Sequence, residues 1–512
     1  MSFAKKFPSI ILKQFKNWPF ALLTLLVLTI YAFFLLDPIN LAAQDVGRHI
    51  TNGREILQGH WSVLFENYYS YSLPNHSFVN HHWFFGVVAF LLEQAFGFAG
   101  LHLVHILVLE AAALFLLKLI KHHSNQLISY LLFLPAILFF TTRVEVRPES
   151  LGLLFLIHTL WQLEKIISCR KITIQQIWLL LIQQLIWTNF HISFIFGISL
   201  PFLLWVCAQF FQSPQLRSKT KQLLLKLGLG LILMSLFNPN FIVGLLQPLA
   251  IFTDYGYSVV ENQTLLFLWR VIRKQVLFPY LSVTIITLLL LLKHWFQITW
   301  YHRWLALSGL FIGFLALRHV PIFVVLAFPV LAKLLNMSFD QLKNKIQINV
   351  SFRQMSAMLA IAYGLTACII FTGKFQQQTN FKNRRLGLMP QQAQAAKFIT
   401  QQQLPQPIFN NYDLGSYLIY YLYPEYQVFT DNRPEAYGQD FFQKTYIPMQ
   451  QLPKKWQQAL AKYKFKTIIF AHRDITPWGV QFLRLIKADE GWQQIYLDEI
   501  VVIYVQSTDQ DQ

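Results

Sequence analysis

Long apolar runs separated by short polar stretches dominate residues 1–373. At about 1.5 Å per residue, runs of roughly 15 to 20 residues can cross most of a hydrocarbon core about 30 Å thick. The pattern predicts a polytopic membrane bundle, mainly α-helical, with about eleven transmembrane helices. They lie near residues 18–36, 101–119, 127–141, 150–166, 175–188, 191–211, 222–237, 276–292, 303–317, 319–336 and 355–373.

One shorter apolar segment, residues 83–96, is predicted to lie at the membrane surface instead of crossing it. The segment carries Glu93 and Gln94, and a crossing there would put Lys118 and Lys121 on the opposite side from the other basic clusters. A helix lying in the interface, or dipping partly into it, avoids this conflict.

Basic residues decide the predicted orientation, because cytoplasmic loops of membrane proteins are enriched in Lys and Arg. Two predicted spans fit between one basic cluster and the next, so all clusters can lie in the cytoplasm with the N-terminus. They are Lys5, Lys6, Lys13 and Lys16, then Lys118 and Lys121, Lys165, Arg170 and Lys171, Arg217, Lys219 and Lys221, Lys293 and Arg303, and Lys343, Lys345 and Arg353.

With this topology the remaining polar clusters of the membrane half all face the outer side. They are residues 45–55, 80–83 (NHHW), 143–150 (RVEVRPES), 187–191 (WTNFH), 238–240 (NPN), 261–262 and 318–321 (RHVP). Independent loops rarely share such content by accident, so a common site is expected at the outer surface.

Residues 374–512 have a different sequence pattern, with helical stretches between short strand-like runs at PIFNN, YQVFTD and KTIIFA. The final WQQIYLDEIVVIYV is typical of a β-hairpin. We therefore predict two domains: residues 1–373 form the transmembrane domain, with a large first outer loop at 37–100. Residues 374–512 form a small soluble α/β domain outside the cytoplasm.

The composition agrees with an integral, multi-pass membrane protein. We expect it in the plasma membrane of a prokaryote. The chain has 512 residues, of which 55% are hydrophobic and 13% charged, and a net charge of +18. Because the basic residues flank apolar runs, membrane topology explains them and no nucleic-acid partner is expected. The three cysteines have no paired spacing, which indicates neither a disulfide framework nor a zinc site.

Asp45, Arg48 and His49 are spaced i, i+3 and i+4, so they share one face if the segment is helical. A carboxylate beside two cations suits a general base that takes a proton from a hydroxyl group while the cations hold an anion. The alternative is a solvated loop in which Asp45 caps a helix beginning at Val46.

Arg143 and Arg147 stand in an outer loop, against the charge asymmetry of the other loops. Their planar guanidinium groups could clamp a phosphate or pyrophosphate. Lipid headgroups are the alternative partners. Arg318 and His319 lie between apolar residues, where a charge is costly unless it pairs or lines a polar cavity; snorkelling to the headgroups is the alternative.

His81, His82, Asn189 and His191 are further candidates. A metal site built from them is conceivable, but no strong ligand spacing supports it. Local hydrogen bonds in the interface explain them more simply, and we assign no metal site. In DNRPEAYG, residues 431–438, the charged Asp431, Arg433 and Glu435 could bind an acceptor or cap a turn, and the spacing does not decide.

Taken in order, these segments resemble the GT-C superfamily of polytopic glycosyltransferases, in an uncharacterised branch distantly similar to mannosyl and arabinosyl transferases that use polyprenyl-phosphate sugars. The resemblance covers nearly the whole chain. The matching segments are QDVGRHITNGREIL, YSYSLPNHSFVNHHW, RVEVRPES, WTNFHISFIFG, NPN, VVENQ, LRHVPIF, IFNNYDLGSYLIYYL and VFTDNRPEAYG.

The resemblance implies an inverting hexosyl or pentosyl transferase. Its donor would be a polyprenyl-phosphate sugar, and its acceptor a hydroxyl group of a glycan, lipid or protein at the outer face of the membrane. An acidic residue of the first outer loop is the usual base, here Asp45, and Glu145 and Glu149 compete for a second acidic position. The first loop lacks a DxD motif, so participation of a divalent cation stays open and no other cofactor is implied.

Two other functions remain as alternatives: a transporter or flippase of lipid-linked sugars, and a non-catalytic assembly protein. A transporter would need polar residues through the depth of the bundle and related halves. Inside the predicted spans we find little that is ionisable beyond Glu110, and no inverted repeat.

Overall fold

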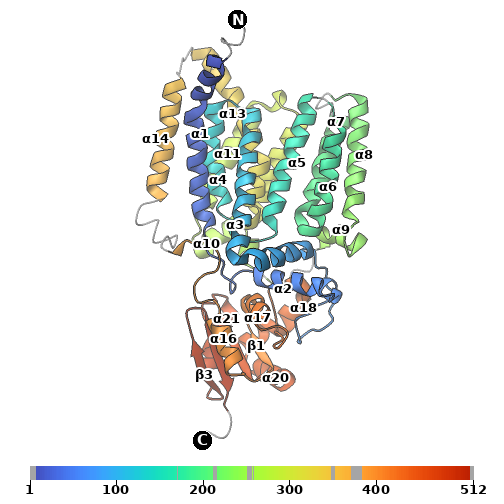
Figure 1. Ribbon diagram of the computed structural model, residues 1–512, viewed down its shortest axis with the longest axis vertical. Helices are drawn as coiled ribbons and strands as arrows, with labels where there is room; N and C mark the ends of the chain where they lie inside the picture. Colours follow the sequence, from blue (N-terminus) through green and yellow to red (C-terminus); the bar gives the residue numbers. More distant parts are fainter. Residues whose placement is uncertain are drawn as a thin grey trace.

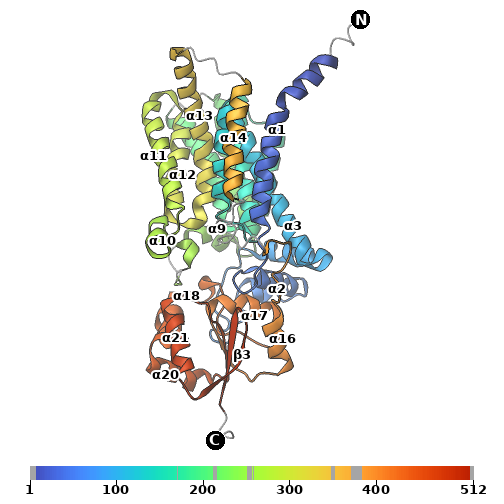
Figure 2. The ribbon, with the colours of Figure 1, turned by 90° about the vertical axis from the view of Figure 1, so that its left-hand side faces the viewer.

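A computed structural model describes residues 7–169, 171–211, 216–250, 256–257, 259–346, 352–370 and 383–507. Lys5, Lys6, Arg170 and the predicted domain boundary at residues 373–374 lie outside these ranges. A bundle of long helices stands on a smaller C-terminal domain, with helix α2 (Val46–Leu57) between them (Figure 1, Figure 2). We call the two ends of the bundle the domain-side end and the far end; the N-terminus lies at the far end.

The bundle has a helix at each of the eleven predicted segments. Its helices are α1 (Phe7–Leu35), α3 (Trp83–His123), α4 (Gln126–Phe140), α5 (Glu149–Cys169), α6 (Ile174–Phe190), α7 (Ile195–Phe210), α8 (Ser218–Ser235), α9 (Phe241–Ala250), α10 (Leu265–Ile272), α11 (Leu277–Lys293), α12 (Trp300–Leu315), α13 (Val320–Ile346) and α14 (Phe352–Ile370).

The chain is a multi-pass membrane protein by the length and composition of these helices. Among the described residues, five helical stretches are long and apolar enough to cross a bilayer. They are Trp18–Leu35, Trp83–His123, Glu149–Ser168, Ile192–Phe210 and Leu317–Lys345. Several other bundle helices are shorter, so the total of eleven spans stays a prediction.

Helix α3 bends sharply at Gly97, whose φ of 64° lies outside the helical range. The part before the bend lies across the domain-side end of the bundle, and the part after it runs along the bundle (Figure 1). Glycine adopts this backbone conformation without the steric cost that a Cβ atom adds. The bend therefore separates the predicted surface helix, residues 83–96, from the first long helix that follows it.

Helix α2 packs against the first part of α3 through two glycines. A Cβ atom on Gly53 would lie 2.1 Å from the carbonyl oxygen of Gly86, and one on Gly86 would lie 2.7 Å from that of His49. Only glycine permits this approach of the two backbones. The contact holds the N-terminal end of α2, where Asp45 is the N-cap residue, at the domain-side end.

The C-terminal domain has a four-stranded sheet in the order β1-β2-β4-β3. Strands β1 (Ile408–Asn410) and β2 (Thr467–Ala471) are parallel, and the other pairs are antiparallel. The predicted final hairpin is confirmed as β3 (Trp492–Leu497) and β4 (Val501–Gln506). Its helices are α16 (Gln394–Gln401), α17 (Gly415–Leu422), α18 (Gly438–Phe441), α19 (Ile447–Gln451), α20 (Pro453–Tyr463) and α21 (Pro477–Lys487).

The prediction of a strand at YQVFTD, residues 426–431, is wrong. Val428 forms only an isolated bridge, with Ser70 of the first loop. The first loop and the C-terminal domain also share one hydrophobic core, which includes Ile39 and Ile50 on one side and Leu418 and Ile503 on the other. Tyr426 and Val428 of YQVFTD therefore pack in this shared core, while Phe429 packs in a second core with Phe409 of β1.

We expect Gly53→Ala to destabilise the protein by about 1–3 kcal/mol, because the new methyl group would have to push the α3 backbone away. The change should appear as a lower thermal unfolding temperature in detergent. Gly228→Ala in α8 is the matched control, since its Cβ atom would meet nothing within 4 Å. Equal unfolding temperatures for the two variants would contradict the close packing.

Candidate active site

A cavity of about 1160 Å³ lies between the domain-side end of the bundle and the C-terminal domain. Small-molecule pockets commonly measure about 300–1,000 Å³, so this one has room for more than a small metabolite. It is lined by most of the residues that the sequence singled out: Asp45, Arg48, His81, His82, Arg143, Glu145, Arg147, Glu149, His191, Arg318 and His319. His49 and Asn189 are buried beside it and do not line it.

Asp45 precedes the first turn of α2, but its carboxylate makes no capping hydrogen bond. Instead, Oδ2 lies 3.4 Å from Nε2 of His49 and 3.7 Å from Nη2 of Arg48. Oδ1 lies 3.9 Å from Nε of Arg147 and has no hydrogen-bond partner. The carboxylate thus lines the cavity and keeps one oxygen without a hydrogen-bond partner, which the capping alternative does not explain.

Two arginines and a hydrogen-bonding histidine ring decide the charge of Asp45. Burial by itself raises the pKa of this carboxyl group, but Arg147, His49 and Arg48 outweigh it and hold the pKa well below its usual range. Asp45 is therefore ionised at neutral pH and can accept a proton or stabilise a developing positive charge.

Arg143 and Arg147 both bind the carboxylate of Glu261, which lies in the short 3-10 helix Val260–Asn262 between α9 and α10. Nη1 of Arg147 donates to Oε1 of Glu261 at 2.9 Å, and Nη1 of Arg143 donates to Oε2. Arg143 also pairs with Glu149 at the start of α5. Burial raises the pKa of Glu261, but the arginines dominate and lower it overall.

Arg318 belongs to the same network. Its Nη1 donates to Oδ1 of Asn262 at 2.9 Å, and its Nη2 lies 3.6 Å from Oε2 of Glu149. The side chain is one-quarter exposed and lines the cavity. Of the alternatives for this residue, pairing in a polar cavity describes its position better than snorkelling does.

Glu261 is the candidate residue that sequence reasoning passed over. The sequence marked residues 261–262 as a polar outer cluster, but nothing in the local pattern linked Glu261 to Arg143 and Arg147, more than 110 residues earlier. The link depends on how the loops meet at the domain-side end. Glu145 stands further out, 3.9 Å from Nη1 of Arg143.

Histidine rings line one side of the cavity. The rings of His82 and His191 stack with centroids 5.2 Å apart, and those of His81 and His82 lie 4.0 Å apart. Burial lowers the pKa of His81 to about 4, so this ring is neutral at pH 7. Asn189 instead accepts a hydrogen bond from Nε1 of Trp83 at 2.8 Å, which agrees with the local role considered for it.

The DNRPEAYG segment, residues 431–438, contains a buried ion pair. Nε and Nη2 of Arg433 donate to the two carboxylate oxygens of Asp431 at 2.7 and 2.6 Å, and Nη2 also donates to Oδ1 of Asn67. Tyr437 donates to Asp431 as well, at 2.9 Å. These residues join the C-terminal domain to the first loop, while Glu435 and Asn432 line the cavity.

The cavity continues from its charged part into the helices of the bundle. Its inner wall is apolar and comes from α3, α4, α5 and α7, through Leu109, Phe140, Leu153, Leu156 and Phe196. A ligand with a charged head and a hydrocarbon tail would match this change of lining.

Comparison with known proteins identifies the fold. No protein-family model and no curated protein sequence matches the chain. Two structures of an oligosaccharyltransferase from Archaeoglobus fulgidus are similar. One is AglB with an inhibitory peptide and a dolichol-phosphate, at a TM-score of 0.61 and 11% identity over 95% of this chain and 74% of that one. The other is the apo form, with a TM-score of 0.57 and 12% sequence identity; the match covers 89% of this chain and 70% of that one.

The chain has the GT-C fold. ArnT from Cupriavidus metallidurans, solved with undecaprenyl phosphate, also matches, at a TM-score of 0.44 and 12% identity over 96% of this chain and 98% of that one. The predicted fold resemblance is thus confirmed, while the roles of the residues in the cavity stay predictions.

The buried Asp431–Arg433 pair should matter for stability. Arg433→Met would leave a buried, unpaired carboxylate, and breaking a buried pair in this way costs about 3–5 kcal/mol. Lys444→Met is the control, because Lys444 pairs with Asp440 at 2.6 Å on the exposed surface. Thermal unfolding in detergent should show a large loss for Arg433→Met and little change for Lys444→Met; similar curves would contradict this assignment.

Proposed function

We propose that this protein is a membrane glycosyltransferase that transfers a sugar from a polyprenyl-phosphate donor to a hydroxyl group of an acceptor. The observation that carries the proposal is one cavity in which Asp45 lies close to Arg143, Arg147 and Arg318 beside an apolar wall. The fold supports it, since the similar AglB structure was solved with a dolichol-phosphate.

The donor would lie with its phosphate at Arg143, Arg147 and Arg318 and its lipid tail along the apolar wall. Guanidinium groups bind phosphate through paired, charge-assisted hydrogen bonds. In the proposed complex they also stabilise the negative charge that grows on the phosphate as it leaves, and exclusion of water would strengthen this effect.

Glu149 and Glu261 would position these arginines. Both carboxylates already bind guanidinium groups, so we propose a positioning role for Glu149 in place of a second base. They keep the buried cations paired before the donor arrives, when an unpaired cluster would be costly. Glu145, at the edge of the network, remains a second candidate acidic residue.

Asp45 would act as the general base. The acceptor oxygen attacks the anomeric carbon, the bond from that carbon to the phosphate oxygen breaks, and the phosphate leaves with the electron pair. The hydroxyl proton passes to Asp45. Direct displacement gives inversion at the anomeric carbon. The resemblance to inverting GT-C transferases implies the same outcome. Arg48 and His49 hold the carboxylate, at 3.7 and 3.4 Å.

The acceptor would enter from the C-terminal domain, which supplies the other wall of the cavity through Tyr412, Asp413, Asn432, Glu435, Arg473 and Asp474. Burial and the neighbouring Asp474 raise the pKa of Asp413 to about 7. Such hydroxyl, amide and carboxyl groups suit a polyhydroxylated acceptor. With the basic clusters in the cytoplasm, this side of the membrane is the outer one.

We expect Asp45→Asn to reduce sugar transfer about 10²–10⁴-fold, the usual contribution of a general base. Purified protein would be incubated with labelled polyprenyl-phosphate hexoses and pentoses in the presence of membrane acceptors. Asp37→Asn is the matched control: Asp37 is in the same loop and pairs with Arg384 at 2.8 Å, but it does not line the cavity. Unchanged transfer by Asp45→Asn would refute the assignment of the base.

We expect Arg147→Lys to weaken binding of undecaprenyl phosphate about ten- to a hundredfold, the cost of one charge-assisted hydrogen bond. Native mass spectrometry or a tryptophan-quenching titration would measure it, and Asp45→Asn should bind the lipid as the wild type does. A wild-type protein that binds no polyprenyl phosphate would contradict the proposed function. Binding and flipping without transfer would favour the flippase alternative.

A further inference from the structure

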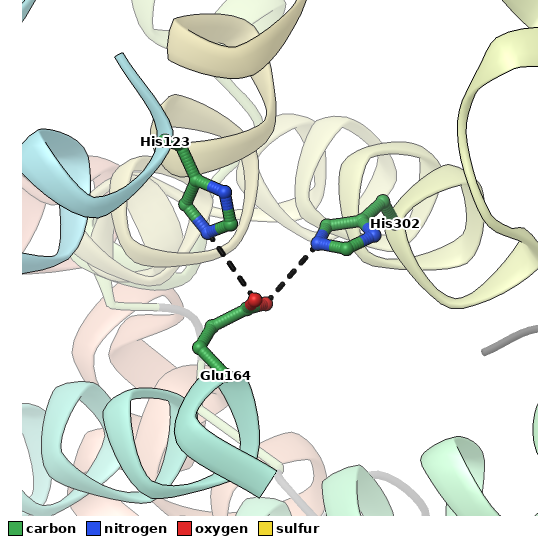
Figure 3. Close-up of side chains that lie close together, drawn as sticks. All are labelled: His123, Glu164 and His302. Atoms are coloured by element: carbon green, nitrogen blue, oxygen red, sulfur yellow. Dashed lines mark ion pairs between the residues drawn. The ribbon is translucent and has the colours of Figure 1, made fainter. Parts of the chain in front are cut away.

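A second cluster of ionisable side chains lies at the far end of the bundle, away from the cavity. His123 ends α3, Glu164 is near the end of α5, and His302 is in the first turn of α12 (Figure 3). On α5, Glu164 is fifteen residues beyond Glu149, or roughly 22 Å along the helix. The cluster is therefore separate from the proposed active site.

The three side chains converge on one point. Nε2 of His123 lies 3.4 Å from Oε2 of Glu164, and Nε2 of His302 lies 3.2 Å from Oε1 (Figure 3). Each histidine thus faces a different oxygen of the same carboxylate. The ligand atoms of all three residues lie within 4.8 Å of one another, the only such group of three among the described residues.

These side chains are buried and their facing nitrogens are unsatisfied. The side chains are only 6% (His123), 5% (Glu164) and 2% (His302) exposed. Neither Nε2 atom makes a hydrogen bond, although each is close to the carboxylate. Buried polar atoms are nearly always bonded, so two buried nitrogens that face one carboxylate without hydrogen-bond geometry leave a place for a common partner.

We propose that His123, Glu164 and His302 bind a divalent transition-metal ion of the zinc class. With bonds of about 2.0–2.1 Å, tetrahedral coordination places neighbouring ligand atoms about 3.3 Å apart. The two nitrogen-to-oxygen distances, each to a different oxygen of Glu164, are close to this spacing, and the ligand atoms of all three residues lie within 4.8 Å of one another. Two histidines and one glutamate form a known zinc ligand set, with the fourth position left to water.

The surroundings of His302 fit metal binding. Its Nδ1 atom is hydrogen-bonded to Oγ1 of Thr299, the N-cap residue of α12. Such a partner on the second ring nitrogen orients a histidine and leaves its Nε2 for the metal. Because Thr299 also caps the helix, the start of α12 and the ring are fixed together.

The rival partner of Glu164 is the ammonium group of Lys333 on α13, which interacts electrostatically with the carboxylate. The ammonium group can neutralise Glu164, but among the described residues it forms no ion pair or hydrogen bond with any of the three ligand atoms. A metal ion uses all three at once and joins α3, α5 and α12. This role is structural and does not depend on the proposed function.

The test uses full-length protein purified in detergent through a tag without histidine, stripped with a chelator and then titrated with Zn²⁺. We expect one tightly bound ion per chain by mass spectrometry of the metal content. Glu164→Gln and His302→Gln should each weaken the affinity at least about tenfold. His122→Gln is the matched control, because His122 adjoins His123 but is exposed and hydrogen-bonded to Ser168.

Two readouts on the wild type keep the test independent of how the variants fold. Co²⁺ should give the intense visible absorption of a tetrahedral site, and Zn²⁺ should raise the unfolding temperature with its concentration. Absence of both, or Zn²⁺ binding that survives both substitutions, would overturn the proposal; the first result would leave Glu164 paired with Lys333. Sugar transfer is a separate readout, so its absence would not affect this test.

Discussion

The cost of burying an unpaired charge governs the domain-side cavity. Arg143 is almost wholly buried, yet it is surrounded by Glu149, Glu261 and, further out, Glu145. A guanidinium group without such partners could not be kept at this depth. The carboxylates therefore explain how a membrane protein can hold several cations ready for an anionic ligand. They also make phosphate binding an exchange, because an incoming phosphate must share donors that already have acceptors.

A second constraint is the joint core of the first loop and the C-terminal domain. Helix α2 packs on α3 through Gly53 and Gly86, and its other side meets α17 of the domain. The backbone N–H of Arg48 donates to Oγ of Ser416 at 3.0 Å, while the Arg48 guanidinium reaches Asn432. Asp45 is thereby held between two parts of the chain that fold against each other. The base proposed for the reaction and the wall proposed for the acceptor belong to one packed unit.

Helix α5 connects the two charged clusters of the molecule. Glu149 begins it at the cavity, and Glu164 near its other end meets two histidines from α3 and α12. In both places a carboxylate on this helix gathers groups from helices far apart in sequence. The apolar surroundings lower the local dielectric constant. Ion pairs and hydrogen bonds within each cluster are therefore stronger than in water, and an unpaired charge there costs more free energy.

The apolar periodicity of the chain by itself determined the helical bundle, the surface helix before Gly97 and the final hairpin, because burial of apolar surface is encoded locally. Charge asymmetry also predicted that the polar clusters share one side of the membrane, and this made Asp45 a candidate. Only the tertiary structure decided the rest. Arg143 binds Glu261 because two loops far apart in sequence meet. YQVFTD does not form a strand of the sheet, and its Val428 forms an isolated bridge with Ser70 of the first loop. Glu164 was passed over since it stands beside the basic Lys165 at a span end, and its partners come from two other helices.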